Sequence, residues 1–392
     1  MSKEINAALA NSLREYMEKR QGEIRSLMRA LAEEESPSGD VKGSRAVVEL
    51  LLKAVDESGV AASVERLPAR GNYGEHLRVH AFGRAAQGER TTLLLGHTDT
   101  VHPRGTLRER PWREEAGRIY APGIFDMKAN CVLALEALRA CAELSLAPTH
   151  PVVLLLTCDE ETGSAHGGRE LVEDESRRAD AVLVLEPPAP GRRVKTARKG
   201  TGMYALVARG RAAHAGLDPE KGASAILEIA RQIARLDALN DAAQGTTLNV
   251  GVVCGGTRSN VVAAEARAEI DVRFSTAVEA KRLEEAMHGL QPFDARVQLE
   301  IEGGINRPPM ERTEAVVRLY EHARRIAALL DFELGEASVG GASDGNFAAA
   351  NCAAVLDGLG VEGDGAHAEH EHIIAADIAL RGALLAGLIT SL

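Results

Sequence analysis

Hydrophobic residues in the first half of the chain gather in short unbroken runs, with stretches of helical periodicity between them. Runs of this length that end at turns are typical of strands buried on both faces of a parallel sheet. The principal runs lie at residues 91–95, 152–157 and 181–185, after strand-like segments at 60–67 and 77–82. Helical patterns lie at residues 4–34, 44–55 and 127–144. The alternation predicts an α/β fold with a mostly parallel sheet flanked by helices.

The pattern changes near Lys195, where polar and apolar residues begin to alternate. Alternation with a period of two is typical of antiparallel strands that have one face in a core and the other in water. Such segments lie at 201–209, 247–254, 266–274 and 296–302, with helical patterns at 223–236 and 281–290. We therefore expect a smaller inserted α+β domain over residues 196–304. Residues 1–195 and 305–392 then form the larger domain.

Length and composition exclude several classes of protein. At 392 residues the chain exceeds the usual size of one hydrophobic core, which agrees with two domains. The formal net charge is -11 and the pI about 5.6, which argues against nucleic acid or anionic membrane as a partner, because both bind basic surfaces. No apolar stretch approaches the ~18 residues that span a bilayer. No glycine-rich phosphate loop follows a strand, so nucleotide chemistry has no support.

The N-terminus and the cysteines indicate the cellular compartment of the protein. The N-terminal residues are charged and amphipathic and contain no apolar signal core. The five cysteines are widely spaced and include no C-x-x-C pair. Free thiols in a reducing compartment fit this pattern best, so we expect a cytoplasmic protein.

Acidic residues and histidines follow the apolar runs. They are His97 and Asp99 after the first run, Glu160 and Glu161 after the second, Glu186 after the third, Asp126 in a turn at 123–127, and His367 near the C-terminus. Because ligand sites form at the carboxyl ends of parallel strands, we expect these side chains to meet in one pocket. Converging carboxylates without a matching Lys/Arg cluster repel one another unless cations neutralise them. The sequence therefore predicts a metal site, with enough ligands for two ions.

Each of these residues also has a simpler explanation when it is taken alone. His97 could be a hydrogen-bonded core histidine, Asp99 a turn residue and Asp126 the cap of the following helix. Glu160 and Glu161 could belong to a solvated acidic loop. On extended backbone, however, His97 and Asp99 point the same way, so a carboxylate could fix the tautomer of the histidine. The adjacent glutamates point in different directions, so one can bind metal while the other moves the proton of an attacking water.

The order and spacing of these motifs resemble those of the zinc-dependent aminoacylase and carboxypeptidase family. That family includes glutamate carboxypeptidase, acetylornithine deacetylase and succinyl-diaminopimelate desuccinylase, and the motifs here are most similar to those of the first. In the larger domain they are H-T-D at 97–99, G-I-F-D-M-K at 123–128, D-E-E-T-G-S at 159–164 and L-E-P at 185–187. In the inserted domain they are G-R-A-A-H-A-G at 210–216 and S-N-V-V at 259–262. The chain departs from the family at Ala129 and Asn130, where two glycines are common.

The resemblance implies a site with two zinc ions per chain, for which cobalt or manganese can substitute. The implied ligands are His97, Asp126, Glu161, Glu186 and His367, with Asp126 bridging the ions. Glu160 is the implied general base and then general acid, and Asp99 is implied to support His97. Because the C-terminal segment holds further histidines, His370 and His372 stay open as alternatives to His367.

For the inserted domain, the resemblance implies a lid or dimerisation role and a homodimer. His214 is the implied hydrogen-bond donor to the oxyanion, delivered by domain closure or from a partner subunit. Asn260, Arg307 and Arg273 are candidates for holding the substrate carboxylate; Arg307 matches best, and Arg273 could equally be structural. Gly341 lies in a turn that would offer backbone N–H groups beside the metals.

These expectations combine into a functional hypothesis. We expect a metal-dependent hydrolase, with a catalytic domain over residues 1–195 and 305–392, that cleaves an amide bond next to a free carboxylate. The first form of the hypothesis is an exopeptidase similar to glutamate carboxypeptidase. The alternative is an N-acyl-amino-acid deacylase of the acetylornithine or succinyl-diaminopimelate type. A remote alternative is a metal-binding protein without catalysis. The expected substrate is a small peptide or an N-acyl amino acid.

Overall fold

A computed structural model describes residues 4–86 and 88–392, and the chain divides into two compact units. The first unit comprises residues 1–196, 312–339 and 343–392, and the second comprises residues 197–311 and 340–342. Because the second unit interrupts the sequence of the first, the chain leaves the first unit after Thr196 and returns to it at Arg312.

The first unit alternates strands and helices along the sequence. Up to the insertion its elements are α1 (Ala7–Lys19), α2 (Gln21–Glu33), α3 (Val41–Ser58), β1 (Ala61–Pro68), β2 (Glu75–Ala81), β3 (Thr91–His97), α4 (Thr106–Glu109), β4 (Arg113–Glu115), β5 (Arg118–Tyr120), α5 (Ala129–Glu143), β6 (Val152–Thr157), α6 (Gly168–Arg178), β7 (Ala179–Val184) and β8 (Val194–Arg198). After the insertion they are α9 (Glu314–Leu329), β13 (Glu336–Val339), α10 (Asp344–Ala349), β14 (Val355–Leu356), β15 (Gly363–Asp364), β16 (His372–Ile374) and α11 (Asp377–Ser391).

The central sheet has six strands in the order β1-β2-β6-β3-β7-β14. The pairings β6–β3, β3–β7 and β7–β14 are parallel, whereas β1–β2 and β2–β6 are antiparallel. The predicted α/β fold with a mostly parallel sheet is therefore confirmed, with an antiparallel edge formed by β1 and β2. Every residue of β3 and β6 is buried, which explains why both strands are almost continuously apolar.

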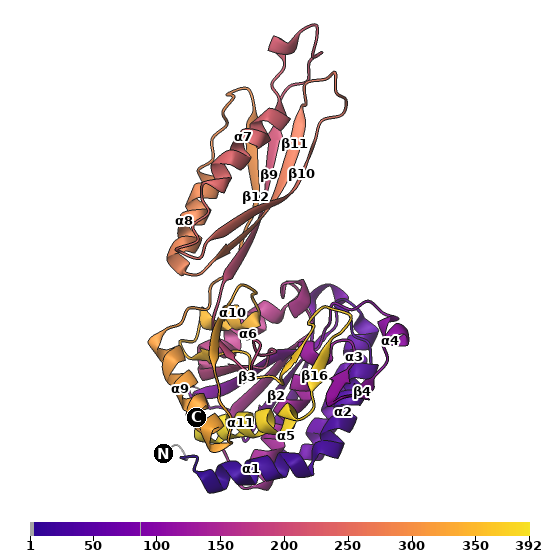
Figure 1. The fold of residues 1–392 in the computed structure, drawn as a ribbon, viewed down its shortest axis with the longest axis vertical. Coiled ribbons are helices and arrows are strands. Elements are labelled where there is room, and N and C mark those ends of the chain that lie inside the picture. Colours follow the sequence, from indigo (N-terminus) through magenta and orange to yellow (C-terminus); the bar gives the residue numbers. More distant parts are fainter. Residues whose placement is uncertain (1–3, 87) are drawn as a thin grey trace. The chain divides into compact units, whose positions relative to one another are not determined.

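Helices cover both faces of this sheet. Helix α5 packs on one side of β3, with α11 beside it, and α6 and α10 pack on the other side, as Figure 1 shows. Helix α11 is apolar almost all round, and the buried residues fill nearly its whole length because it packs against α1, α5 and α9. The helix expected over residues 4–34 is two helices that part at Arg20, whose guanidinium bonds to Glu136 of α5 at 2.7 Å.

The second unit is an α+β sandwich. Its elements are β9 (Gly200–Arg209), α7 (Ala225–Asp237), β10 (Thr247–Gly255), β11 (Glu265–Phe274), α8 (Ala277–His288) and β12 (Gln298–Arg307). The strands form an antiparallel sheet in the order β10-β11-β9-β12, and α7 and α8 pack on one of its faces. The inward side chains of each strand build a core that is separate from that of the first unit. Side-chain oxygens of Ser224 and Thr276 cap the two helices.

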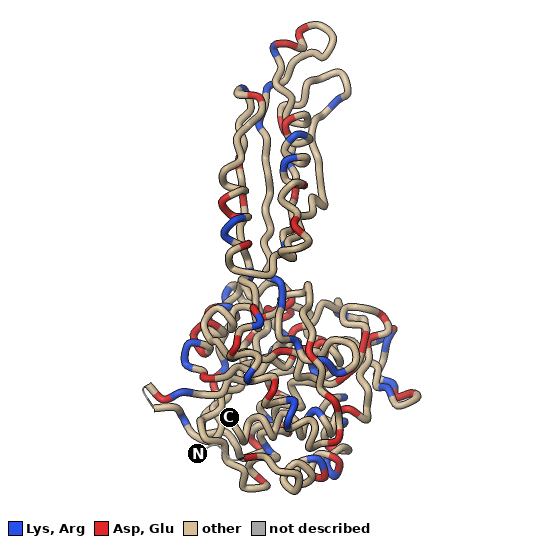
Figure 2. Tube along the Cα trace, turned by 60° about the vertical axis from the view of Figure 1, so that its left-hand side comes forward, with Lys and Arg blue, Asp and Glu red and all other residues tan. Residues whose placement is uncertain are grey.

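Acidic and basic residues are interspersed along the chain in both units, as Figure 2 shows. Among the described residues, no helix combines the length and the apolar character that crossing a membrane requires.

Candidate metal centre

His97 ends β3 at the carboxyl edge of the central sheet and is only 1% exposed. Its Nε2 lies 3.2 Å from Asp126 Oδ1 and 3.6 Å from Glu186 Oε1. Its Nδ1 lies 3.0 Å from the carbonyl oxygen of Asp99 and 3.4 Å from the carboxylate Oδ1 of the same residue. The nearer partner is thus the carbonyl and not the carboxylate that the sequence suggested. Either partner fixes the ring so that Nε2 faces the carboxylates.

Hydrogen bonds to the carboxylate of Glu371 fix the backbone around Asp126. The buried carboxylate of Glu371 accepts hydrogen bonds from the N–H groups of Gly123 (2.7 Å), Phe125 (2.9 Å) and Asp126 (3.0 Å). Glu371 also lies 2.6 Å from His102 Nε2. Residues 124–128 form an irregular turn in which Asp126 has non-helical dihedrals, and α5 begins only at Ala129. The simpler explanation of Asp126 as a helix cap is therefore wrong, and its carboxylate is left facing the cluster.

Glu161 and His367 close the other side of the cluster. His367 Nε2 lies 3.1 Å from Glu161 Oε2 and 3.4 Å from Asp126 Oδ2. Glu161 Oε1 is buried and has no hydrogen-bond partner among the described residues. An acceptor left buried without a donor is costly, and it indicates that a cation or another donor belongs beside it.

Charges in the cluster depend strongly on one another. Burial alone would lower the pKa of His97, but hydrogen bonds with Asp126 and Asp99 raise it well above the usual range. Hydrogen bonds with Asp126 and Glu161 raise the pKa of His367 to about 10. Burial would raise the pKa of Asp126, yet His367 and His97 lower it. The carboxylates thus favour positive charge on the two imidazoles. Bound metal ions supply positive charge at sites of this kind.

Asp99 connects the two glutamates to His97. Its carboxylate accepts hydrogen bonds from the backbone N–H groups of Glu160 (3.3 Å) and Glu161 (3.2 Å) and from the Ser38 hydroxyl (2.6 Å). These bonds hold the short 3-10 turn Glu160–Thr162 against the end of β3. Asp99 therefore positions backbone and does not itself enter the group of converging side-chain atoms.

Two sets of side chains offer ligand atoms that all lie within 4.8 Å of one another. One set is His97, Glu160 and Glu186, and the other is His97, Asp126 and Glu161. His367 contacts the second set through the distances given above. Imidazole nitrogen and carboxylate oxygen are common zinc ligands. Glu161 Oε1, which has no hydrogen-bond partner among the described residues, could coordinate a metal ion. The residues fit the predicted metal ions, and they would hold them at this edge of the sheet.

The other C-terminal histidines lie elsewhere. His370 is exposed and has Asp364 Oδ2 3.9 Å from its Nε2. The His372 ring packs against Tyr120, with ring centroids 5.1 Å apart, and its Nδ1 lies 2.9 Å from the carbonyl of His370. Among the three histidines, the structure brings only His367 to the described cluster.

The second unit brings His214 and Asn260 together. Ala215 N–H donates to the Asn260 carbonyl at 3.0 Å, and His214 pairs with Val261 in a bridge. His214 is exposed, and its Nδ1 accepts hydrogen bonds from the N–H groups of Gly216 (3.1 Å) and Leu217 (3.2 Å). In the neutral ring the proton therefore sits on Nε2, which is left as a donor.

The remaining candidates of the second unit differ in what they contact. Arg307 is 8% exposed and ends β12 beside Thr201 of β9. Arg273 bonds twice to Asp271 two residues away, at 2.8 and 3.0 Å. The Gly341 carbonyl accepts a hydrogen bond from Arg198 at 3.1 Å. The guanidinium of Arg273 is thus already paired with a carboxylate, which favours a structural role for this residue.

Comparison with known families settles the relationship of the chain. Residues 93–391 match the model of peptidase family M20/M25/M40. The chain belongs to peptidase family M20/M25/M40. The resemblance inferred from the motifs is thereby confirmed, and membership makes the chain a hydrolase of the peptidase and amidohydrolase type.

Named relatives within family M20 act on different bonds. The chain is 30% identical over 313 residues to carboxypeptidase G2 of Pseudomonas sp., a match that covers 78% of this chain and 75% of that protein. It is 28% identical over 352 residues to a succinyl-diaminopimelate desuccinylase of Delftia acidovorans, covering 84% and 89%. An aminopeptidase PepT from Bacillus cereus shares the fold with a TM-score of 0.75 at 22% identity, covering 95% and 98%.

The departure from the M20 motif at Asn130 has a structural reason. Asn130 is fully buried, its Nδ2 donates to the Phe125 carbonyl at 3.3 Å and its Oδ1 accepts from Val361 N–H at 2.9 Å. A Cβ built on Gly360 would clash with this side chain at 2.2 Å, so a glycine provides the room that Asn130 occupies. The asparagine therefore ties the Asp126 turn to the segment after β14.

Sequence reasoning missed the supporting role of Glu371 and His102. Neither residue was among the candidates that the motifs indicated. The backbone donors to Glu371, at residues 123–126, are more than 240 positions from it in the sequence, and His102 contacts Glu371 across 269 positions. The one available signal was a glutamate that the structure shows to be 2% exposed, in a segment rich in glycine and histidine.

Proposed function

We propose that this protein is an exopeptidase similar to glutamate carboxypeptidase, which cleaves an amide bond next to a free carboxylate of a small peptide. The observation that carries the proposal is the convergence of two imidazoles and four carboxylates at one edge of the sheet, with Glu160 among them. The similarity to carboxypeptidase G2 supports the choice of bond.

Two zinc ions, for which cobalt or manganese can substitute, would polarise the scissile carbonyl and lower the pKa of a water molecule when bound. His97, Asp126, Glu161, Glu186 and His367 are the proposed ligands. Asp126 is proposed as the bridge, because its two oxygens already face different imidazoles: Oδ1 faces His97 and Oδ2 faces His367.

Glu160 is proposed to move the proton. It is 7% exposed, and its backbone is fixed by the Asp99 carboxylate at 3.3 Å. A carboxylate held at this position can accept a proton from the attacking water and later donate it to the nitrogen of the leaving amine. Its place in the same set of atoms as His97 and Glu186 puts it within reach of a water in the cluster.

Residues of the second unit are proposed to bind the substrate. His214 would donate from Nε2 to the oxyanion, since its Nδ1 is already occupied by backbone N–H groups. Arg307 and Asn260 would bind the substrate carboxylate, with Gly341 in an adjoining turn. Arg273 is the weaker candidate, because Asp271 already binds its guanidinium.

An N-acyl-amino-acid deacylase is the second candidate function. It would use the same machinery on a different acyl group, and the similarity to a desuccinylase over 84% of the chain supports it. A metal-binding protein without catalysis is the remote candidate, and the Glu160–Glu161 pair argues against it.

We also propose a cytoplasmic homodimer. All five cysteines are free, and four of them are buried, which suits a reducing compartment. Met203 and Val252 are 71% and 51% exposed and line one groove on the sheet of the second unit. Exposed apolar side chains that gather on one face are typical of interfaces.

A substrate screen tests the proposed function. Purified protein is reconstituted with zinc, cobalt or manganese and assayed against dipeptides with C-terminal glutamate and against N-acetyl and N-succinyl amino acids, each with and without chelator. Release of a C-terminal amino acid that chelator abolishes supports the peptidase. Preference for the acyl amino acids would transfer the assignment to the deacylase, and absence of hydrolysis in every arm would leave only metal binding.

A further inference from the structure

A buried carboxylate that is not among the candidate ligands contacts the segment that carries Glu160 and Glu161. It belongs to Asp344, which is the first residue of α10 and only 3% exposed. Asp344 Oδ2 accepts a hydrogen bond from the Thr157 hydroxyl at 3.1 Å, and its Oδ1 accepts one from the Ser164 hydroxyl. Both hydroxyl groups belong to fully buried residues, so the two bonds are shielded from water.

The two hydroxyl groups lie at opposite ends of the segment that carries the glutamates. Thr157 is the last residue of β6, and Ser164 follows the 3-10 turn Glu160–Thr162. Asp344 therefore ties the start of this segment to its end. The backbone N–H groups in the middle of the segment donate to the Asp99 carboxylate. Two carboxylates from distant parts of the chain thus fix one short loop at its ends and at its centre.

Ser164 adopts a backbone conformation that is rare for serine. Its φ is 59°, in the left-handed region, where a glycine would fit with less strain. Its N–H donates to the Asp159 carbonyl at 2.8 Å, which closes the loop. A strained residue persists where the surrounding contacts over-determine its conformation. The hydroxyl bond to Asp344 is such a contact, and it gives a reason for a serine at this position.

Asp344 is held in place from its own side as well. The Ser343 hydroxyl accepts from Gly345 N–H at 3.1 Å, and Ser343 N–H donates to Asn346 Oδ1 at 2.9 Å, which forms a capping box around the start of α10. The Ser343 hydroxyl also donates to the Asp357 carboxylate at 2.9 Å. A support whose own position is fixed can hold functional side chains precisely.

We propose that Asp344 is a positioning residue that aligns Glu160 for proton transfer and Glu161 for metal binding, through its bonds to Thr157 and Ser164. This inference rests on the proposed function. Asp344 belongs to neither set of converging ligand atoms, so it acts through the loop and not on the reacting atoms. Misplacing a catalytic group by about 1 Å can cost about 10²-fold in rate, so fixing both ends of the loop matters for turnover.

A double-mutant cycle of Asp344→Asn and Ser164→Ala tests the proposal, with the zinc-saturated protein and the substrate that the screen identifies. Each single variant should lower kcat by about 10–100-fold, the usual effect of removing a group that supports ligands from behind, and change KM less than about twofold. Because both substitutions disturb the same bond, the combined variant should lose little more than Asp344→Asn alone. Losses that multiply, or natural kcat in Asp344→Asn, would overturn the proposal.

Two substitutions of Thr157 separate positioning from packing. Thr157→Ser keeps the hydroxyl donor and loses a methyl group, whereas Thr157→Val keeps the shape and loses the donor. Both should lower the melting temperature, because the position is fully buried. We expect natural kcat in Thr157→Ser and a fall of about 10-fold in Thr157→Val. Equal kcat in the two variants would show that the hydroxyl does not position the loop, and would contradict the proposal.

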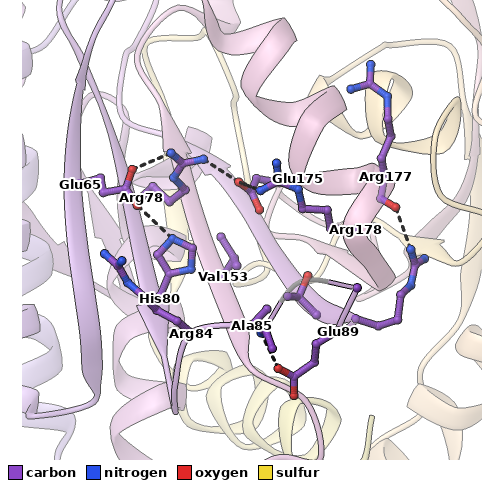
Figure 3. Close-up of a pocket in the computed structure, with 14 residues that line it drawn as sticks. Glu65, Arg78, His80, Arg84, Ala85, Glu89, Val153, Glu175, Arg177 and Arg178 are labelled. Carbon is purple, nitrogen blue, oxygen red and sulfur yellow. Dashed lines mark hydrogen bonds and ion pairs between the residues drawn. The ribbon is translucent and has the colours of Figure 1, made fainter.

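Glu175→Gln is the control for the loss of a buried carboxylate elsewhere in the first unit. Glu175 is 1% exposed and accepts a hydrogen bond from Arg78 at 2.6 Å, as Figure 3 shows. The cavity drawn there also has Arg90 in its wall, just before β3 begins, whereas His97 ends that strand. We expect this variant to lower the melting temperature and to leave kcat and zinc affinity unchanged. A fall in kcat as large as that of Asp344→Asn would show that turnover follows stability alone, which overturns the proposal.

Zinc affinity, measured by competition with a chelator, distinguishes failure of this proposal from failure of the proposed function. Glu161 is a proposed ligand on the same loop, so Asp344→Asn should bind zinc about 10-fold or more weakly even if no substrate is hydrolysed. A natural protein that binds zinc and hydrolyses nothing contradicts the proposed function, and the loss of zinc affinity in Asp344→Asn would still support the role of Asp344 toward Glu161. Zinc affinity equal to that of the natural protein in Asp344→Asn overturns it.

Discussion

The candidate site residues compared here differ in burial between the two units. In the first unit His97 is 1% and Glu160 7% exposed. The carboxylates of Asp99 and Glu371 accept hydrogen bonds from the backbone of the converging residues and hold them in place. In the second unit His214 and Asn260 are exposed. The first unit thus brings together a buried group of imidazoles and carboxylates that could hold metal ions, whereas His214 and Asn260 of the second unit lie at its surface. We propose from this contrast that the first unit is preorganised for chemistry and that the second contributes to substrate recognition.

Surface composition extends this contrast. Of the ten exposed large hydrophobic residues in the described chain, Val64 and Val101 belong to the first unit, and the other eight belong to the second. Exposed apolar side chains that gather on one surface are typical of interaction sites. If chemistry and recognition are divided between the units in this way, substitutions in the two units should change different measured quantities.

The largest effect is expected for Glu160→Gln, which keeps the volume and removes the base. We expect turnover to fall by ~10²–10⁴-fold, the usual share of positioned acid–base catalysis, while metal content stays unchanged. Steady-state kinetics and elemental analysis measure both quantities, and Glu57→Gln on the exposed side of α3 serves as control. Near-natural turnover would reject Glu160 as the proton carrier.

His214→Ala tests the second unit. Turnover should fall by ~10²–10³-fold, as for other single oxyanion donors, with metal binding intact because no ligand is touched. Turnover equal to that of the natural protein would show that His214 has no role in catalysis.

Mixing two inactive variants then distinguishes the routes of donation. If a partner subunit supplies the ring, dimers of Glu160→Gln and His214→Ala chains contain one site with both residues, so activity should return. If the ring comes from the same chain, mixed dimers stay inactive. Chain exchange is verified by differently tagged subunits.

Glu371→Gln tests how the first unit positions Asp126. A glutamine has one acceptor oxygen where the carboxylate uses two for three N–H groups and His102. We expect metal affinity to fall by about 10–100-fold, as for other groups that support ligands from behind. Competition with a chelator of known affinity measures this, and Glu369→Gln, exposed two residues away, is the control. Equal affinities in both variants would contradict the positioning role.

The smallest effect is expected for Arg273→Gln. Its guanidinium pairs with Asp271 on the same strand, and a partly exposed ion pair is worth about 0.2–1 kcal/mol of the free energy of unfolding. KM should change less than about twofold, whereas Arg307→Gln should raise KM by about 10-fold or more if it binds the substrate carboxylate. A large rise in KM for Arg273→Gln would show that both arginines bind substrate.

The elements that place the metal centre could be predicted because they follow from local patterns. Unbroken apolar runs mark β3, β6 and β7, and their carboxyl ends mark His97, Glu160 and Glu186. The break at Arg20 could not be predicted, because its bond to Glu136 joins residues 116 positions apart. The three bonds of Glu371 to residues 123–126 likewise depend on the finished fold. Sequence pattern thus identifies which residues converge, and tertiary contacts decide what holds them there.

The most direct test of the preformed centre is the zinc content of the chain. Protein stripped with chelator, reconstituted with zinc and freed of excess metal is analysed by mass spectrometry, together with Asp126→Asn and Arg273→Gln. We expect close to two zinc ions per chain for the natural protein and Arg273→Gln, and weakened binding of both ions in Asp126→Asn, because a bridging ligand belongs to both. At most one zinc per natural chain, or an unchanged content in Asp126→Asn, would contradict it.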